Sequence, residues 1–400
     1  MNKDLSRLFE IANAPSRLII GLMSGTSLDG LDIALCRFEG SGPGTKVKLL
    51  HFKTISYPPE VKSRLKPISS KPVVALQDVT LLNAWLGSYF AELINAALKA
   101  WNVRPSEVDL IASHGQTIFH APFFQHQQEP YGNATLQIGD GDHIAVKTGI
   151  ITLSDFRQKH IAGGGEGAPL ALYGDYLMFS DPKEHRVLLN IGGIANFTWL
   201  PALKEESHGL QLPKVFSTDT GSGNTLMDQY VQKHFPGKQY DEDAKIALRG
   251  RVHDVLLSRL LDLPFFKLEF PKTTGPEVFS LSHLEEVITE VAHRIAPEDV
   301  LATLAQFSAI GIVRALEATI PAGTNYKVYV SGGGMHNPLL IQQLEARLGK
   351  KMESTALLDL DPDAKEAVLF ALLANECISG PKINIEGQPA VAMGKISFPG

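Results

Sequence analysis

Short apolar runs separated by glycine-rich segments predict strands over the first third of the chain, the first three of them arranged as a meander. Between residues 82 and 101, apolar residues recur at steps of three and four and indicate a helix with one broad apolar face. Two later apolar runs end in polar segments, and polar residues at strand ends are where the sites of α/β proteins usually lie. The strands expected in this part of the chain are residues 18–23, 31–38, 47–55, 109–113 and 149–154.

The same succession of elements returns in the second half of the chain, from about Arg186 onward. Strand, the tight turn Gly192-Gly193, strand, strand and helix follow one another as they do in the first half. Because the residues of the two halves barely match, we interpret the pattern as a structural duplication rather than a sequence repeat. The expected strands are 187–191, 195–200, 215–218 and 328–331, and the expected helices are 224–234, 281–295, 297–319, 338–348 and 363–377.

Composition indicates an ordinary globular protein with two lobes. The 400 residues exceed what one hydrophobic core usually supports. With 20% charged residues and a formal net charge of −6, the chain has no bias toward nucleic acid or an anionic membrane, so a phosphate-bearing ligand must be held locally. Cys36 and Cys377 stand far apart, without a CxxC motif, and residues 1–17 carry charges but no apolar leader segment. We therefore expect a cytoplasmic protein.

Glycine turns after strands are the candidate phosphate-binding elements. None of the three Gly-Lys pairs is followed by Ser or Thr, which excludes a P-loop. Each glycine turn alone is common in β-hairpins, but four of them favour backbone N–H groups that converge on an anion. In the first turn, Ser24, Thr26 and Ser27 add hydroxyl donors, and Asp29 and Asp32 could hold a hydrated Mg²⁺. The turns are GLMSGTSLDG at 21–30, NIGGIAN at 190–196, DTGSGN at 219–224 and VSGGGMHNP at 330–338.

A fifth glycine segment, GGGEGA at 163–168, matches the dinucleotide-binding pattern G-x-G-x-x-A. A Rossmann turn leaves its strand directly, whereas the polar run 155–160 separates these glycines from the expected strand. In addition, no acidic residue ends a second parallel strand at the required distance. These two observations argue against a dinucleotide site.

Together the motifs resemble the signatures of anhydro-N-acetylmuramic acid kinases, in the family's order from about Leu18 to Asn375. The resemblance implies an α/β fold of two RNase H-like lobes of the actin/hexokinase/Hsp70 type, with ATP in the cleft between them. It implies a reaction that hydrolyses the 1,6-anhydro ring of the sugar and phosphorylates O6, giving N-acetylmuramic acid 6-phosphate in cell-wall sugar recycling. The lobes are expected at 1–155 with about 380–400, and at 156–379. The matching segments are GLMSGTSLDGLDIAL, SHGQT, LQIGDGDHIA, DFR with GGGEGAPL, LLNIGGIANFT, DTGSGNTLMD, VSGGGMHNPLL and PDAKEA.

The turns and the resemblance together predict a site for ATP and Mg²⁺, with Asp29 as the expected metal ligand. The residues expected at the nucleotide are Gly25, Thr26, Ser27, Leu28, Asp29, Gly30, Leu31, Asp32, Gly192, Gly193, Asn196, Gly221, Gly332, Gly333, Gly334 and Asn337.

Asp219 is the candidate general base, because it follows an apolar strand and stands beside two glycines of a phosphate turn. The resemblance agrees, since the family carries its catalytic aspartate in this motif. The alternative is that Asp219 only caps the helix expected from Asn224. Glu366 is the second carboxylate expected at the sugar. Its alternative is a first-turn glutamate favoured by the helix dipole.

Neutral and cationic groups suited to a sugar lie in two further motifs. Arg157 could pair bidentately with the lactyl carboxylate of the sugar, or it could form a plain surface ion pair. Hydroxyl, imidazole and amide groups suited to the sugar's own polar groups belong to Ser113, His114, Gln116 and Thr117. His114 could instead be a hydrogen-bonded core histidine.

Three segments depart from the family pattern: Pro276 replaces a common arginine, Asp243-Ala244 replaces an aspartate-glycine, and residues 384–389 replace a C-terminal motif. They leave open a kinase of the same fold for another sugar. The implied fold also leaves open a non-kinase ATP-driven binding module, as in actin and Hsp70-type proteins. The expected partner is a small anhydro amino sugar, with neither nucleic acid nor membrane. The oligomeric state is open, with a homodimer as one candidate.

Overall fold

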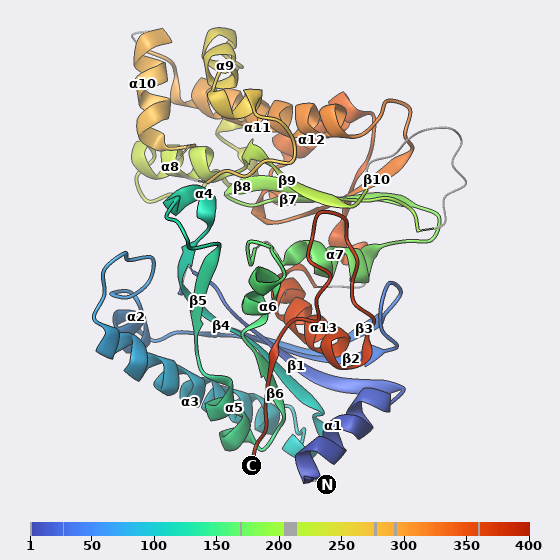
Figure 1. Ribbon diagram of the computed structural model, residues 1–400. Coiled ribbons are helices and arrows are strands. Elements are labelled where there is room, and N and C mark those ends of the chain that lie inside the picture. Colours follow the sequence, from blue (N-terminus) through green and yellow to red (C-terminus); the bar gives the residue numbers. More distant parts are fainter. Residues whose placement is uncertain are drawn as a thin grey trace. The chain divides into compact units, whose positions relative to one another are not determined.

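The computed structural model describes residues 2–26, 28–168, 170–203, 214–275, 278–291, 294–358 and 361–400. Contacts along the chain divide it into two compact units, whose elements are labelled in Figure 1. Unit 1 consists of Met1–Met178 and Asp363–Gly400, and unit 2 consists of Phe179–Pro362. Each unit has its own sheet and hydrophobic core, as a chain of this length requires.

The described strands of unit 1 are β1 (Ser16–Ser24), β2 (Gly30–Glu39), β3 (Lys46–Ser56), β4 (Leu110–Ala121), β5 (Ala134–Ile138), β6 (Thr152–Ser154) and β12 (Lys395–Ser397). They form one sheet in the order β12-β6-β4-β1-β2-β3, with β5 paired to β4. β1, β2 and β3 are antiparallel neighbours, whereas β4 runs parallel to both β1 and β6. The predicted N-terminal meander is therefore confirmed.

The helices of unit 1 are α1 (Lys3–Asn13), α2 (Pro59–Leu65), α3 (Leu76–Ala100), α4 (Phe123–His126), α5 (Gly141–Thr148), α6 (Phe156–Ala162), α7 (Ala171–Phe179), which ends at the boundary, and α13 (Lys365–Ser379). Successive side chains of a strand point to opposite faces. Ile20 and Leu22 of β1 accordingly join the core that includes residues of α3, while Gly21 faces Ala367 of α13. Helix α3 packs along α5 (Figure 1). A Cβ atom at Gly21 would lie 1.8 Å from the Ala367 carbonyl oxygen, so only glycine permits this approach.

Unit 2 repeats the strand order of unit 1. Its described strands are β7 (His185–Ile191), β8 (Ile194–Leu200), β9 (Phe216–Ser222), β10 (Tyr326–Ser331) and β11 (Met352–Ser354). The order β9-β8-β7-β10-β11 matches β3-β2-β1-β4-β6, with an antiparallel meander followed by two parallel strands in both cases. This topology is that of an RNase H-like lobe, so the predicted duplication and fold class are confirmed.

Helix α11 forms the centre of unit 2. The helices of this unit are α8 (Thr225–His234), α9 (Asp254–Leu261), α10 (Leu281–Val291), α11 (Pro297–Thr319) and α12 (Pro338–Leu348). Among the described residues, α11 alone has the length and apolar composition to cross a membrane, but 78% of its apolar window is buried. It contacts α8, α9, α12 and the sheet (Figure 1), as a core helix of a globular domain does.

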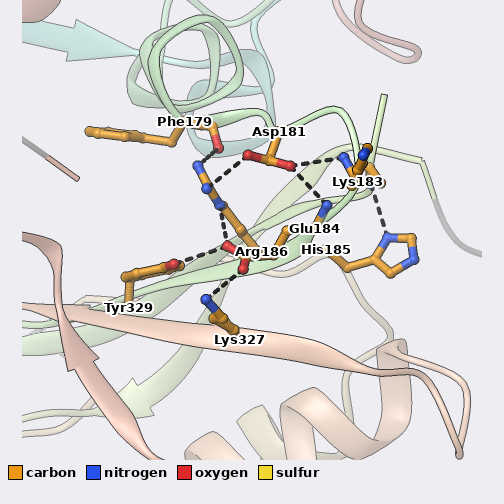
Figure 2. Close-up of polar contacts among 9 residues, drawn as sticks. Phe179, Asp181, Lys183, Glu184, His185, Arg186, Lys327 and Tyr329 are labelled. Carbon is orange, nitrogen blue, oxygen red and sulfur yellow. Dashed lines mark hydrogen bonds and ion pairs between the residues drawn. The ribbon is translucent and has the colours of Figure 1, made fainter. Parts of the chain in front are cut away.

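Arg186 on β7 fastens the first residues of unit 2 to the sheet. Figure 2 shows its guanidinium surrounded by three acceptors from the preceding segment. It donates to the Phe179 carbonyl at 2.8 Å, to Asp181 at 3.1 Å and to Glu184 at 2.7 Å. Because these bonds use separate nitrogens of one planar group, they fix the segment in one position.

Glu184 joins this contact to the neighbouring strand β10. Its second carboxylate oxygen lies 2.7 Å from the Lys327 ammonium, and the Tyr329 hydroxyl donates to the first oxygen at 2.9 Å (Figure 2). Burial would raise the pKa of Glu184, but the hydrogen bonds from Lys327, Arg186 and Tyr329 outweigh it and lower the pKa. The carboxylate is therefore held in its charged form.

Several predicted bounds differ from the observed ones. The helix expected at 82–101 begins at Leu76, and the strand expected at 109–113 continues through the SHGQT motif to Ala121. The helix expected to reach residue 295 ends at Val291 within the described residues. The lobe boundaries expected at 155/156 and 379/380 contrast with unit boundaries at 178/179 and 362/363. The C-terminal boundary differs because helix α13 packs on β1, β2 and β4 of unit 1, a tertiary contact.

Candidate functional site

Buried polar groups support the first glycine turn of unit 1 at Ser24 and Gly25. Ser24, the last residue of β1, donates to the Gln116 side-chain oxygen at 2.5 Å and shares a hydrogen bond of 2.6 Å with the Tyr57 hydroxyl. The Gln116 amide donates to the Gly25 carbonyl at 3.1 Å. Gln116 is fully buried, so in this arrangement it supports the turn instead of facing the sugar as expected.

Most of the residues of this turn that are expected at the nucleotide can offer a ligand their backbone but not a side chain. Leu28 and Leu31 place their side chains in the core of unit 1. Gly30 is required by close packing, because a Cβ there would lie 2.4 Å from the Ile55 carbonyl oxygen. Gly25 is half-buried and Thr26 is exposed, whereas Ser27 lies outside the described residues. The turn can therefore offer backbone N–H groups and the Thr26 hydroxyl.

The two carboxylates near this turn differ in environment. Asp29 is exposed and lies 3.9 Å from the Lys62 ammonium. Asp32 on β2 accepts a hydrogen bond from the Thr54 hydroxyl at 2.6 Å. Burial raises the pKa of Asp32, the Thr54 bond opposes this, and the Asp363 charge adds to it. Among the described residues no group of three or more His, Cys, Asp or Glu side chains could hold a metal ion alone. An Mg²⁺ here therefore fits only with phosphate oxygens and water completing its ligands.

His114 and Arg157 form a buried pair in unit 1. The Arg157 Nε group donates to His114 Nε2 at 3.0 Å, and His114 Nδ1 lies 2.8 Å from the Gly115 carbonyl oxygen. Burial and the Arg157 charge lower the pKa of His114 to about 3. The imidazole is therefore neutral, and it orients the guanidinium. The histidine is thus a hydrogen-bonded buried residue, as the alternative reading of the sequence allows.

The negative charge of Glu366, the first-turn glutamate of α13, also acts on Arg157. The Arg157 Nη1 group donates to the Gly167 carbonyl at 2.7 Å, while Nη2 has no partner within the described residues. Burial lowers the pKa of Arg157 and the Glu366 charge opposes this. Although Glu366 keeps an exposed surface, protein packed around its carboxyl group and the Asp32 charge raise its pKa, while Arg157 and Lys365 oppose the shift.

The glycine segment 163–168 follows helix α6 instead of a strand, so the Rossmann alternative is wrong. The Gly167 N–H donates to His160 Nδ1 at 2.9 Å, and His160 Nε2 lies 3.2 Å from the Gln388 side-chain oxygen. Asn133 donates to the Gly165 carbonyl at 3.1 Å. The segment is thus a folded loop that supplies the carbonyl holding Arg157.

The other two residues of the SHGQT motif lie apart from Arg157. Ser113 is fully buried and its hydroxyl accepts from the Gly115 N–H at 3.2 Å. Thr117 accepts a hydrogen bond of 3.0 Å from the Gln137 amide. Ser113 and His114 line a cavity of about 380 Å³ whose wall also includes Asp155. The structure therefore brings His114 and Arg157 together but does not place all four residues at one surface.

In unit 2, strand register places four polar residues in a row. Ser331 of β10 is opposite Asn190 of β7, Asn190 is opposite Asn196 of β8, and Asn196 is opposite Asp219 of β9. Opposite residues of neighbouring strands point to the same face. The row therefore presents hydroxyl, two amides and a carboxylate on one side of the sheet, next to the glycine turns that follow β7 and β10.

The backbone of residues 272–274 holds Asp219. The Asp219 N–H donates to the Lys272 carbonyl at 2.9 Å, and the Thr274 N–H donates to Asp219 Oδ2 at 2.7 Å. Oδ1 has no partner among the described residues. Burial raises the pKa of Asp219, and the Thr274 N–H opposes the shift. The helix-capping alternative is wrong, because Asn224 occupies the N-cap position of α8.

Lys272 anchors this supporting segment inside an aromatic pocket. Its side chain is buried, and the ammonium donates to the Phe265 carbonyl at 3.0 Å and to the Leu268 carbonyl at 3.4 Å. It also lies 4.4 Å from the Phe265 ring centre and 4.2 Å from that of Phe270. Such cation–π contacts stabilise a desolvated ammonium. Burial lowers the pKa of Lys272.

The glycine turns of unit 2 pack against one another. The N–H groups of Gly223 and Asn224 donate to the carbonyls of Gly193 and Gly192 at 2.9 and 2.8 Å. A Cβ on Gly223 would lie 2.2 Å from the Gly192 carbonyl oxygen. Gly332 has φ of 82° and could not carry a Cβ without meeting Ile191. These glycines allow the turns after β7, β9 and β10 to meet.

A cavity of about 440 Å³ opens beside these turns in unit 2. Gly333 and Asn337 of the predicted nucleotide site line it, and the Asn337 side chain also caps α12 by accepting from Leu340 N–H at 3.0 Å. Gly334 packs on Ile191, and Gly221 faces Phe266 and Phe279, so these two glycines serve packing. The remaining lining residues are Asn224, Met227, Asp228, Tyr240, Asp241, Glu242, Asp243, Ala247, Leu301 and His336.

Several of these residues are not identified by sequence motifs alone. Asn190 stands within the NIGGIAN motif, but its place in the polar row depends on strand register. Lys272 and Thr274 support Asp219 from more than 50 positions away. Asp228 could have been found as the acidic residue four positions after Asn224 in DTGSGNTLMD. Of the departures, Pro276 lies outside the described residues, and Ala244 has φ of 53°, the left-handed conformation that glycine adopts without strain.

Comparison with known proteins agrees with these motifs. The sequence profile of the family described as anhydro-N-acetylmuramic acid kinase matches residues 17–391. A relative of that name from Pseudoalteromonas atlantica is 54% identical over 407 residues, which is all of both chains. Another, from Caldanaerobacter subterraneus subsp. tengcongensis, is 38% identical and covers 98% of this chain and 100% of its own.

Among solved structures, a ROK family glucokinase from Streptomyces griseus covers 90% of this chain and 99% of its own, with 13% identity and a TM-score of 0.38. A likeness this low says nothing about function. The family profile and the full-length relatives are sufficient: the chain belongs to the anhydro-N-acetylmuramic acid kinase family.

Proposed function

We propose that this protein uses ATP to phosphorylate O6 of anhydro-N-acetylmuramic acid while water opens the 1,6-anhydro ring. The observation that carries the proposal is the position of Asp219 at the end of a polar row beside three glycine turns. Its carboxylate is half-buried, and one oxygen has no partner among the residues that the structure describes. Membership of the family supports the choice of sugar. The expected product is N-acetylmuramic acid 6-phosphate, and a cytoplasmic setting is part of the proposal.

Asp219 acts as the general base. Its Oδ2 is fixed by the Thr274 N–H, so Oδ1 is the atom that accepts the proton of the attacking water. The water oxygen forms a bond to C1, the C1–O6 bond breaks, and O6 attacks the γ-phosphorus while ADP leaves. Desolvation raises the pKa of Asp219, and a less acidic carboxyl group is a stronger base.

The nucleoside part of ATP occupies the cavity in unit 2. Met227, Leu301 and the ring of Tyr240 provide apolar contacts for a base, while Gly333 and Asn337 lie at the turn after β10. The glycine turns supply backbone N–H groups for phosphate oxygens. Mg²⁺ would neutralise phosphate charge when bound, and Asp29 or Asp32 is the residue of this chain that would hold it.

Unit 1 supplies recognition of the sugar. The Nη2 group of Arg157 remains available for the lactyl carboxylate because His114 and Gly167 occupy the other nitrogens. A guanidinium oriented in this way binds a carboxylate with little loss of side-chain entropy. Glu366 is the carboxylate that accepts hydrogen bonds from sugar hydroxyl groups. Arg157 and Glu366 are near enough for the charge of each to shift the pKa of the other.

Phosphate transfer from ATP to anhydro-N-acetylmuramic acid, compared with a panel of free hexoses and amino sugars, tests the proposal. We expect turnover with the anhydro sugar far above that with any free sugar. In ¹⁸O-labelled water, the label should enter the product at C1 and not the transferred phosphoryl group. Preferential phosphorylation of a free sugar would instead favour the same-fold kinase for another substrate.

A further inference from the structure

Four carboxylates line the cavity of unit 2, and three of them are already engaged. Asp241 accepts from the N–H groups of Ile246 and Ala247, both at 2.8 Å. Glu242 and Asp243 lie 3.4 and 3.0 Å from the Lys245 ammonium. Asp241 therefore holds the 241–247 segment in its local fold, while the charges of Glu242 and Asp243 are paired with the exposed Lys245 ammonium.

Asp228 is the fourth, and its side chain has no hydrogen bond or ion pair within the described part of the chain. It lies in the first turn of α8, four residues after Asn224, with which it shares the cavity wall. Its partial burial raises the pKa of the carboxyl group to about 6. Asp228 is half-buried and lines the cavity, so a ligand bound there would supply the hydrogen-bond donors that only water supplies otherwise.

The chemistry of a carboxylate restricts what that ligand group can be. An ionised carboxylate accepts hydrogen bonds and donates none, which excludes phosphate oxygens on grounds of charge. Its two oxygens match two neighbouring O–H donors, as in the 2′,3′-diol of a ribose. The 6-amino group of adenine is a poorer match, because the ring nitrogens on either side of it are acceptors that would face the carboxylate.

Resting on the proposed use of ATP, we propose that Asp228 binds the 2′- and 3′-hydroxyl groups of the nucleotide and makes the protein selective for ribonucleotides. The neighbouring residues fit this assignment. Met227, Leu301 and Tyr240 can contact the base, and Gly333 lies at the turn that leads toward the phosphates. The ribose between base and phosphate then meets the carboxylate that lacks a partner.

Nucleotide binding by calorimetry and turnover are measured with ATP, 2′-deoxy-ATP and 3′-deoxy-ATP, on the wild type, Asp228→Asn and Asp228→Ala. Loss of one hydrogen bond to a charged group weakens binding on the order of tenfold or more, so the wild type should prefer ATP over each deoxy analogue by about that factor. The ratio should fall toward one in Asp228→Ala and partly in Asp228→Asn. Asp243→Asn is the matched control and should keep the ratio, because Asp243 lines the same cavity but pairs with Lys245.

The ratio within one variant is independent of how much of that variant is folded. Equal binding of ATP and both deoxy analogues by the wild type would overturn the assignment, as would full discrimination in Asp228→Ala. An Asp228-dependent preference for ATP over inosine triphosphate, without a preference for the ribose, would assign the residue to the adenine amino group and also overturn it. Ribose-selective binding without any transfer to the anhydro sugar would support Asp228 while defeating the proposed function.

Discussion

The hydrogen bonds of His114 are compatible with only one tautomer of its imidazole, and this fixes the geometry of the pair with Arg157. Arginine only donates, so His114 Nε2 must be an acceptor and the proton must reside on Nδ1, which donates to the Gly115 carbonyl. Protonation of Nε2 would place two donors face to face. The sequence indicates both residues as candidates, but their pairing joins positions 43 apart and depends on the tertiary fold.

Acid should destabilise the protein partly through His114. Its pKa is about 3 in the folded protein against an ordinary value of 6.5, so between these values the unfolded chain binds a proton that the folded chain does not. Above pH 6.5 the free energy of unfolding does not depend on this histidine's protonation. As the pH falls below 6.5, the free energy of unfolding decreases by up to about 1.4 kcal/mol per pH unit. His114→Gln should flatten this part of the profile.

Chemical denaturation at a series of pH values measures the effect on the free energy of unfolding. Gln158→Asn is the control, since Gln158 is a neutral neighbour of Arg157 that donates to the Thr135 carbonyl. An unchanged slope between pH 4 and 6 in His114→Gln would contradict the neutral, buried state assigned to this histidine.

Asp219→Asn should lower kcat by a factor on the order of a hundred to ten thousand, because the variant keeps the shape of the side chain and loses the proton acceptor. ATP affinity should change little. Because the pKa of Asp219 is raised above its ordinary 3.8, wild-type kcat/KM should fall with acid at a pH above that value, and the fall should be absent from the residual activity of the variant. If Asp219→Asn kept near-normal turnover while Glu366→Gln abolished it, the roles of the two carboxylates would be reversed.

At the scale of elements, strand register brings the site residues together. Register depends on which strands pair, so local sequence patterns predict the strands but not the site that they form. Short apolar runs bounded by glycine turns correctly place β1, β2, β3, β7 and β8, because such runs report buried segments of chain. The row of Ser331, Asn190, Asn196 and Asp219 requires the pairing of four strands, one of them more than 100 residues further along the chain. No local pattern contains that information.

Gly21→Ala should destabilise unit 1, because the new methyl group would lie 1.8 Å from the Ala367 carbonyl oxygen and both atoms belong to rigid elements. Forced overpacking of this kind costs about 1–3 kcal/mol or more. Gly132→Ala is the matched control, since a Cβ there meets no atom within 4 Å. Thermal unfolding of both variants compares the two sites. Equal melting temperatures for Gly21→Ala and the wild type would show that α13 can move away from β1 without cost.

At the scale of the molecule, the duplicated topology is predictable and the division of the chain is not. Both halves show strand, glycine turn, strand, strand in their sequence, and both form the same strand order. The C-terminal helix α13 belongs to unit 1 because its apolar residues pack on β1, β2 and β4. This long-range contact has no signature in composition, so the sequence assigns α13 to the wrong half of the chain relative to the observed units.

The proposed assignment of nucleotide and sugar to different residues predicts that each substrate protects different segments from hydrogen exchange. ATP with Mg²⁺ should protect residues 190–196, 219–228 and 240–247 of unit 2, because the turns and the cavity lie there, and residues 28–32 of unit 1, where Asp29 and Asp32 are proposed to hold Mg²⁺. The anhydro sugar alone should protect residues 155–168 of unit 1, where Arg157 and its supporting loop lie. A ligand at a hundred times its Kd stabilises the folded state by about 2.7 kcal/mol, which slows exchange in the bound segments by roughly a hundredfold at most. Protection of 155–168 by ATP alone, with none in 240–247, would place the nucleotide outside the cavity of unit 2 and remove the basis for assigning Asp228 to its ribose.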